Sequence, residues 1–412
     1  MNFNTTWCMA VGGMIGGGIF SVLGIVIQEA GRWTWLSFII AGLIAVFTAY
    51  SYSALSTKFK KGGGAFTFLK VTKHQELGAN VAWVLVMGYI LTVSVYAFTF
   101  GHYVASVFNQ GSWLPRLLSV LIIVLLTVIN LKGITKSALT EIITVYGKLI
   151  ILLVLAIFGI LQGDARNLSP DTGDAKTIVD AFIGAAIIFM AYEGFQLLSY
   201  DYEDLEEPDK TLPHATISAV IFVMLVYVVI FYGSTMLVGR EIIIEEKEIA
   251  LAIAGKKAFG QIGLYFLTLA AAFSTASAIN ATLYSTAKLM KDIAKDNELP
   301  ELFSQENFNQ VPANSILAIS IMSSILAVIG SLGSLVEVAS IIFLIVFSVV
   351  NFIAFKEKVK YRWVCFLGFI ASLVATLIAG YYQAHDHLVE LLTLLALILF
   401  IKILRSKLKL GS

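Results

Sequence analysis

Apolar runs of about twenty residues recur along the whole 412-residue chain, and no other feature limits its fold as strongly. A helix rises about 1.5 Å per residue, so each run is long enough to cross a hydrocarbon layer about 30 Å thick. Charged residues make up only 13% of the chain, whereas a soluble protein carries about 25%. The sequence therefore predicts an all-α integral membrane protein.

The hydropathy pattern predicts about twelve transmembrane helices joined by short loops, with no soluble domain. Their expected ranges are 5–28, 33–57, 80–108, 116–131, 138–161, 178–200, 214–238, 261–287, 313–331, 333–355, 361–382 and 386–404. With the N-terminus placed inside, the inner loops hold more than twice as many lysines and arginines as the outer loops. The positive-inside rule then predicts a multi-pass protein of the cell membrane with both termini in the cytoplasm.

Several classes of partner and chemistry find no support in the sequence. The net charge is +1 and no basic stripe occurs, so no nucleic acid partner is expected. The segment "KKGGGAF" lacks the G-K-[ST] ending of a phosphate loop, so no nucleotide is expected. No metal-ligand cluster, paired carboxylates or nucleophile–base set is found, so neither an enzyme nor a cofactor is predicted. The choice between monomer and homo-oligomer stays open.

The first span contains "VGGMIGGGIF", residues 11–20, in which five of ten residues are glycine. A glycine inside a helix costs roughly 1 kcal/mol relative to alanine. Close helix packing accounts for Gly12 and Gly16, which are four residues apart. It accounts poorly for the consecutive run 16–18, so we expect the helix to break there.

The sixth span, "IVDAFIGAAIIFMAYEGFQLLSY", carries Glu193 and Gly194 at its middle and is also expected to break. Interrupted helices at corresponding places in two halves are typical of an inverted repeat with a binding site at the midplane. We expect one repeat in 1–162, a second in 163–356, and two extra helices with a short tail in 357–412.

A break at mid-membrane has a chemical consequence. Unpaired backbone groups are tolerated there only where protein buries them or a cavity wets them. The positive end of a half-helix attracts a carboxylate, and unpaired carbonyls attract an ammonium group. Two facing breaks therefore predict a receptor for a zwitterion.

Six segments occur in an order that resembles one known family. They are "IGGGIF" (15–20), "YSALSTKFKKGGGAFTFLK" (52–70), "FMAYEGF" (189–195), "EDLEEPDKTLPHA" (203–215), "STASAINA" (274–281) and "AKDNELP" (294–300). Together they resemble the amino acid–polyamine–organocation (APC) superfamily of transporters, including its proton-coupled members. The resemblance implies ten helices in two inverted repeats and transport of amino acids by alternating access.

The resemblance also implies roles for residues at the two breaks. The substrate carboxylate is expected on the backbone of Ile15, Gly16, Gly17 and Gly18. The substrate amino group is expected on carbonyls around Met14, Phe189, Met190 and Glu193. Relatives often have serine at position 17, so one hydroxyl donor is expected to be missing here.

Lys148 lies about ten residues into the fifth span, in "VYGKLIILLVLAIFGI". A charge at this depth is costly and usually functional. The resemblance implies that this lysine occupies the place of a sodium ion and contacts carbonyls of the first helix and the hydroxyls of Ser274 and Ser277. Two interpretations stay open: a proton carrier, which is favoured, and a structural lysine that fills a polar gap.

Glu193 and Tyr192 lie at the second break. Glu193 is expected to receive a substrate ammonium group, a cationic side chain or a proton, or to form an internal pair. Tyr192 and Phe195 either shape the site or only pack. The leading hypothesis is proton-coupled symport of amino acids, and the alternatives are an exchanger or a polyamine or organocation carrier. An ion channel is disfavoured because two unlike breaks occur once each in a long chain.

Overall fold

The computed structural model describes residues 1–108, 111, 113–133, 138–168 and 176–386, and this part of the chain is helical without strands. The helices of the first half are α1 (Phe3–Met14), α2 (Gly18–Ala30), η1 (Gly31–Trp33), α3 (Thr34–Phe59), α4 (Ala65–Val71), α5 (Gln75–Ala105), α6 (Trp113–Leu131), α7 (Ala138–Gln162) and η2 (Ala165–Leu168). Those of the second half are α8 (Ile178–Ile187), η3 (Phe189–Tyr192), η4 (Phe195–Asp204), α9 (Pro208–Val238), α10 (Arg240–Glu245), α11 (Ala250–Lys295), η5 (Glu301–Phe303), α12 (Ala313–Ile329), α13 (Leu332–Lys356) and α14 (Arg362–Asp386).

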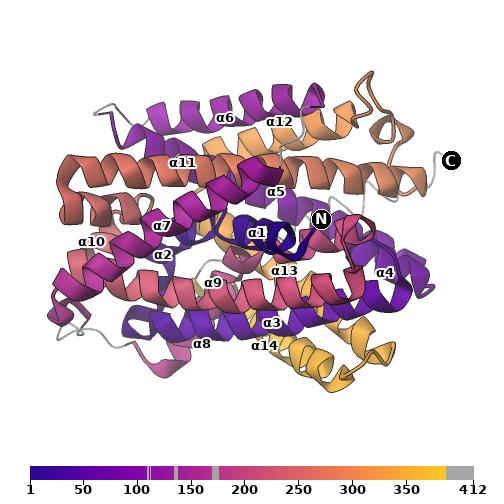
Figure 1. Cartoon of the computed structure of the whole chain (residues 1–412), viewed down its shortest axis with the longest axis horizontal. Coiled ribbons are helices and arrows are strands. Elements are labelled where there is room, and N and C mark those ends of the chain that lie inside the picture. The colour runs from indigo at the N-terminus through magenta and orange to yellow at the C-terminus, as the bar shows by residue number, and fades with distance from the viewer. Residues whose placement is uncertain (109–110, 112, 134–137, 169–175, 387–412) are drawn as a thin grey trace.

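The long helices form one bundle and run roughly along its longest axis (Figure 1). By length and composition, eight helical stretches of the described residues can cross a membrane, and the bent pair of α8 with η3 and η4 makes nine. The predicted all-α, multi-span fold is confirmed. Each of the first eleven expected spans coincides with a helix or a broken pair, and the twelfth, 386–404, falls almost wholly outside the described residues.

Two spans differ most from their expected ranges. The eighth span is longer than 261–287, because α11 also includes a segment that turns sharply at Phe259 and Gly260. Gly260 has φ 64°, a conformation that only glycine adopts without strain, and the chain doubles back so that Gly255 contacts Gly263.

The seventh span begins earlier than expected. Pro208 occupies the first position of α9, where its fixed φ suits a helix start, and Pro213 lies inside the helix. The expected range, 214–238, excluded Pro213, whereas the structure includes it in the helix. A proline at this position removes one intrahelical hydrogen bond, and the helix continues through it.

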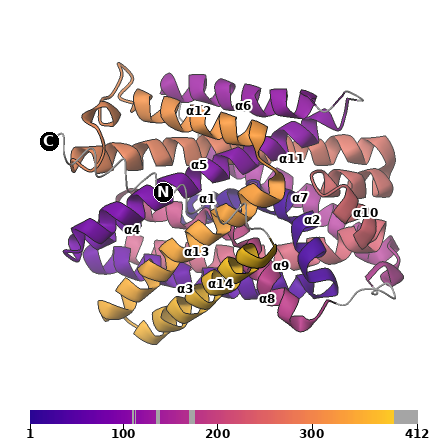
Figure 2. The same ribbon diagram turned by 180° about the vertical axis from the view of Figure 1, so that it is seen from behind.

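One end of the bundle carries most of the described lysines, and we call it the lysine-rich end. It contains the α3–α4 turn, the start of α9, the end of α11 and the α13–α14 turn, which lie together at the left of the view from behind (Figure 2). Three lysines of the segment from the end of α3 to α4 pair with acids of three other elements: Lys58 with Glu357, Lys60 with Asp209, and Lys70 with Asp296.

The broken helices lie at the centre of the bundle. Helix α1 contacts α7, α9, α11 and η4, and η3 contacts α2, α3 and α13. Helix α5 passes beside them and is almost wholly buried, although its sequence is as apolar as that of a lipid-facing span. Both breaks are therefore enclosed by protein, as unpaired backbone groups at membrane depth require.

Candidate functional site

The first helix breaks where the glycine run predicts. Helix α1 ends at Met14 and α2 begins at Gly18. The amide of Ile15 still bonds to the Val11 carbonyl, 2.9 Å away, and the amide of Gly16 turns to the Gly13 carbonyl at 3.2 Å. The helical ladder then stops, so the predicted break is confirmed.

Each glycine of the run 16–18 is approached by a different helix. A Cβ on Gly16 would lie 2.5 Å from Ala278 of α11, and one on Gly18 would lie 2.7 Å from the Tyr227 hydroxyl of α9. A Cβ on Gly17 would overlap the ring of Tyr96 on α5. No side chain fits at any of the three positions unless neighbouring atoms move. Glycine here therefore allows neighbouring helices to approach the backbone closely, in addition to allowing the helix to break.

Lys148 lies where the sequence places it. Its side chain projects from α7 with only 3% of the residue exposed. The Nζ atom donates a hydrogen bond to the Gly12 carbonyl, 3.0 Å away. This carbonyl is one of the last four of α1, which lack partners within the helix. The ammonium group therefore caps the end of the broken helix.

Two hydroxyl groups cap the carbonyls that follow. Tyr227 Oη lies 2.8 Å from the Met14 carbonyl, and Ser274 Oγ donates to the Ile15 carbonyl at 2.7 Å. Ser274 was predicted to lie near this helix, and it does. Ser277 lies less than one turn further along α11 and is half-buried.

The second break is confirmed as well, but it is built differently. After α8 the chain forms the short 3-10 helix η3, Glu193 is extended, and Gly194 has φ 127°. The two halves are bent by 62°. Ser340 of α13 holds the break: its Oγ donates to the Ile187 carbonyl at 2.5 Å and accepts from the Met190 amide at 3.0 Å.

The two breaks touch each other. A Cβ on Gly13 would lie 3.1 Å from Gly194 Cα. The Tyr227 hydroxyl lies 2.9 Å from the Ala191 carbonyl as well as beside Met14. One hydroxyl proton serves one acceptor at a time, so Tyr227 links the two broken helices through alternative hydrogen bonds. Sequence reasoning missed it, because one tyrosine in an apolar span gives no signal.

Glu193 is buried inside the second break, with 2% of the residue exposed. Its Oε1 accepts a hydrogen bond from Gln196 Nε2 at 2.8 Å, and Gln196 Oε1 accepts from the Gly194 amide at 2.9 Å. The Tyr96 side chain lies near the carboxyl group without hydrogen-bond geometry. Within the described part of the chain, no cation forms an ion pair with Glu193.

The remaining predicted residues pack tightly around these groups. Phe189, Met190 and Tyr192 are fully buried. The Tyr192 hydroxyl donates to the Phe38 carbonyl at 2.6 Å, which anchors η3 to α3. The backbone positions predicted to bind the substrate, 14–18, 189, 190 and 193, are all buried. The site is therefore closed to solvent in this conformation.

These features define a class of protein. Two broken helices meet at the centre of a membrane-spanning bundle, and buried polar side chains hold their exposed backbone groups. Broken helices of this kind form the central binding sites of secondary transporters. No group of metal-ligating side chains occurs in the ranges that the structure describes.

Comparison with known proteins gives the family. The model of a family described as "Amino acid permease" matches residues 1–401. The chain therefore belongs to the amino acid permease family, and it is an amino acid transporter rather than an enzyme. The resemblance to APC transporters noted in the sequence is confirmed.

Three relatives illustrate the range of the family. The protein MJ0609 of Methanocaldococcus jannaschii is 29% identical, with 91% of this chain and 87% of the relative covered. The inner membrane transport protein YbaT of Escherichia coli is 28% identical, with coverage of 85% and 82%. The serine/threonine exchanger SteT of Bacillus subtilis is 25% identical, with coverage of 71% and 67%.

Proposed function

We propose that the protein is a secondary active transporter that carries an amino acid together with a proton across the cell membrane by alternating access. Both termini are proposed to face the cytoplasm, and residues 1–162 and 163–356 to form the two inverted repeats. The observation that carries the proposal is the buried hydrogen bond from Lys148 Nζ to the Gly12 carbonyl, 3.0 Å long.

Lys148 offers a means of coupling a proton to movement of the first helix. A hydrogen bond donated by an ammonium group is roughly twice as strong as one between neutral groups. When Lys148 is charged, it holds the end of α1 against α7. Loss of the proton weakens this cap, so α1 becomes freer to move relative to α7. Ser274 supplies a further polar contact at this end of α1. In this proposal Ser277 does so as well.

The substrate is proposed to bind between the two breaks. Its carboxylate meets backbone amides of 15–18, and its ammonium group meets carbonyls near Met14, Phe189, Met190 and Glu193. The Met14 carbonyl already has a hydrogen bond from Tyr227, and its second lone pair remains for an ammonium group. The ring of Tyr96, which covers Gly17, has to move before the carboxylate can reach this backbone.

One specific observation supports a second candidate. The relative SteT is named as a serine/threonine exchanger, and an exchanger needs no proton. In that case Lys148 is a structural cap with a constant charge. A carrier of polyamines or other organic cations is a further alternative, because Glu193 lacks an ion-pair partner within the described residues.

Uptake of radiolabelled amino acids into liposomes that contain the purified protein separates these functions. We expect accumulation above equilibrium with an inward proton gradient alone. Accumulation that needs amino acid inside the liposomes identifies an exchanger and contradicts proton-coupled symport. Uptake driven by sodium alone contradicts the proposed role of Lys148.

A further inference from the structure

A groove at the lysine-rich end lies apart from the two breaks. It has a volume of about 200 Å³ and is bordered by the start of α5, the end of α13 and part of α14. Its walls include Leu77, Val349, Phe352 and Phe369. Leu77 and Phe352 are 43% and 44% exposed, so these apolar walls also face outward from the bundle.

The groove lies at the boundary of the membrane. Two candidate spans meet there, since one begins at Gln75 and the other ends at Lys356. A third begins close by, at Arg362. The apolar walls therefore adjoin the hydrocarbon region, and the polar rim lies at the level of lipid headgroups.

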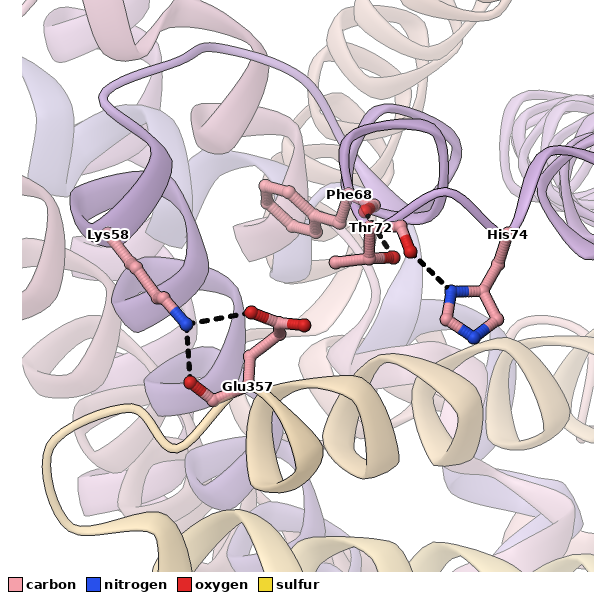
Figure 3. Close-up of polar contacts among 5 residues, drawn as sticks. All are labelled: Lys58, Phe68, Thr72, His74 and Glu357. Carbon is pink, nitrogen blue, oxygen red and sulfur yellow. Dashed lines mark hydrogen bonds and ion pairs between the residues drawn. The ribbon is translucent and has the colours of Figure 1, made fainter.

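Two nitrogen groups stand together at the rim. Lys356 Nζ lies 3.1 Å from His74 Nε2. The other ring nitrogen of His74, Nδ1, lies 2.7 Å from the Thr72 carbonyl, which can only accept (Figure 3). Nδ1 therefore carries a proton, and in the neutral ring Nε2 turns its lone pair toward the Lys356 ammonium group.

The acidic group at the rim is already neutralised. Lys58 Nζ lies 2.7 Å from the Glu357 carboxylate and also donates to the Glu357 backbone carbonyl (Figure 3). In the described part of the chain, Lys356 has no ion pair. The side chains at the rim therefore present a net positive charge above apolar walls.

We propose that this groove binds an anionic phospholipid, with the phosphate at Lys356, which His74 positions at the rim, and one acyl chain along Leu77, Phe352 and Phe369. Basic pockets between transmembrane helices are suited to anionic headgroups. A small soluble anion would leave the apolar walls uncovered, and a neutral lipid would leave the lysine unpaired. The ligand that satisfies both parts is an anionic lipid.

Native mass spectrometry of the full-length protein tests the proposal with phosphatidylglycerol and phosphatidylcholine of the same chain length. We expect wild type to retain phosphatidylglycerol preferentially. Loss of one lysine near an anionic headgroup should lower this retention by about fivefold in Lys356→Gln. Lys61→Gln is the matched control, because Lys61 is exposed at the same end and does not border the groove. Val349→Trp fills the groove and should lower retention of both lipids.

Three results would overturn the proposal. One is equal retention by Lys356→Gln and Lys61→Gln, with both variants eluting as single species. Another is displacement of the lipid by glycerol phosphate alone, which would indicate a site for a free anion. The third is crosslinking between Val349→Cys and a cysteine placed in 387–412, which would show that this chain covers its own groove.

Discussion

The two broken helices at the centre differ in how they are held. Lys148 on α7 caps the first break at Gly12, whereas Ser340 on α13 caps the second at Ile187 and Met190. In the proposed inverted repeat, α7 and α13 are the fifth helices of the two halves. The two caps therefore occupy corresponding places, but only the first of them is an ionisable side chain.

The breaks also differ in what they require of the backbone. The first is a gap between helices in which glycines admit neighbouring atoms, and Gly17 has φ −129°. The second depends on Gly194, whose φ is 127° and which abuts Gly13. We infer that the second break is the rigid element and the first is the responsive one.

The largest effect is expected for Gly194→Ala. A side chain at this φ is strained, and the new Cβ would lie 2.6 Å from the Gly13 carbonyl carbon, so we expect destabilisation above about 3 kcal/mol. Thermal unfolding in detergent measures it. Gly380→Ala is the control, because nothing lies within 4 Å of its Cβ position. Equal stability of the two variants would show that the second break is not rigid.

The second-largest effect distinguishes the cap made by Lys148 from the cap made by Ser340. A charge-assisted hydrogen bond is worth about 1.5–3 kcal/mol, so Lys148→Gln should slow uptake by about tenfold to about a hundredfold. In the proposed mechanism, Lys148→Gln should also remove the dependence of uptake on pH. Ser340→Ala should slow uptake and leave the pH profile unchanged, because a hydroxyl group does not titrate. Initial uptake rates measured across a range of pH test this difference. If both variants changed the pH profile of uptake in the same way, the proposed contrast between Lys148 and Ser340 would be contradicted.

A smaller effect is expected for Tyr227→Phe, which removes the hydroxyl shared by Met14 and Ala191. A hydrogen bond contributes about 1 kcal/mol, so substrate affinity should fall by about fivefold. Calorimetric titration measures the affinity. Tyr265→Phe is the control, since Tyr265 is 49% exposed on α11. An unchanged affinity would mean that the two breaks are not linked through this hydroxyl.

The smallest effect concerns how the thermal stability of the protein depends on pH. Lys291 donates a hydrogen bond to Glu306, which lies between η5 and α12 and outside the candidate spans, and lowers the pKa of this carboxyl group. A lowered pKa stabilises the folded state above the unfolded-state pKa, and this stabilisation disappears as pH falls through the folded-state pKa. Glu306→Gln should therefore unfold at a slightly lower temperature than wild type at neutral pH and at the same temperature in acid. A difference that persists in acid would contradict this assignment.

Functional residues could be predicted from the sequence where they interrupt the apolar pattern of a span. Consecutive glycines and an acid beside Gly194 stand out in apolar spans, so both breaks could be located. Lys148 could be found for the same reason, because a charge in an apolar run demands a partner. The proton that Lys148 is proposed to carry stays a prediction.

The neutral partners could not be found. Tyr227, Ser340 and Gln196 stand in spans that contain other hydroxyl and amide groups, and only the packing of distant helices selects these three. The reversal at Gly260 depends on one glycine, which gives a weak signal by itself. Local composition thus predicts where a helix breaks, and tertiary packing decides which side chains hold the break.

Proton movement driven by the substrate tests the central claim most directly. Liposomes that contain the protein and a pH-sensitive dye receive an inward amino acid gradient with no initial pH difference. We predict that the lumen acidifies with wild type and does not acidify with Lys148→Gln. Amino acid entry into wild-type liposomes without acidification, or equal acidification with Lys148→Gln, would contradict the account.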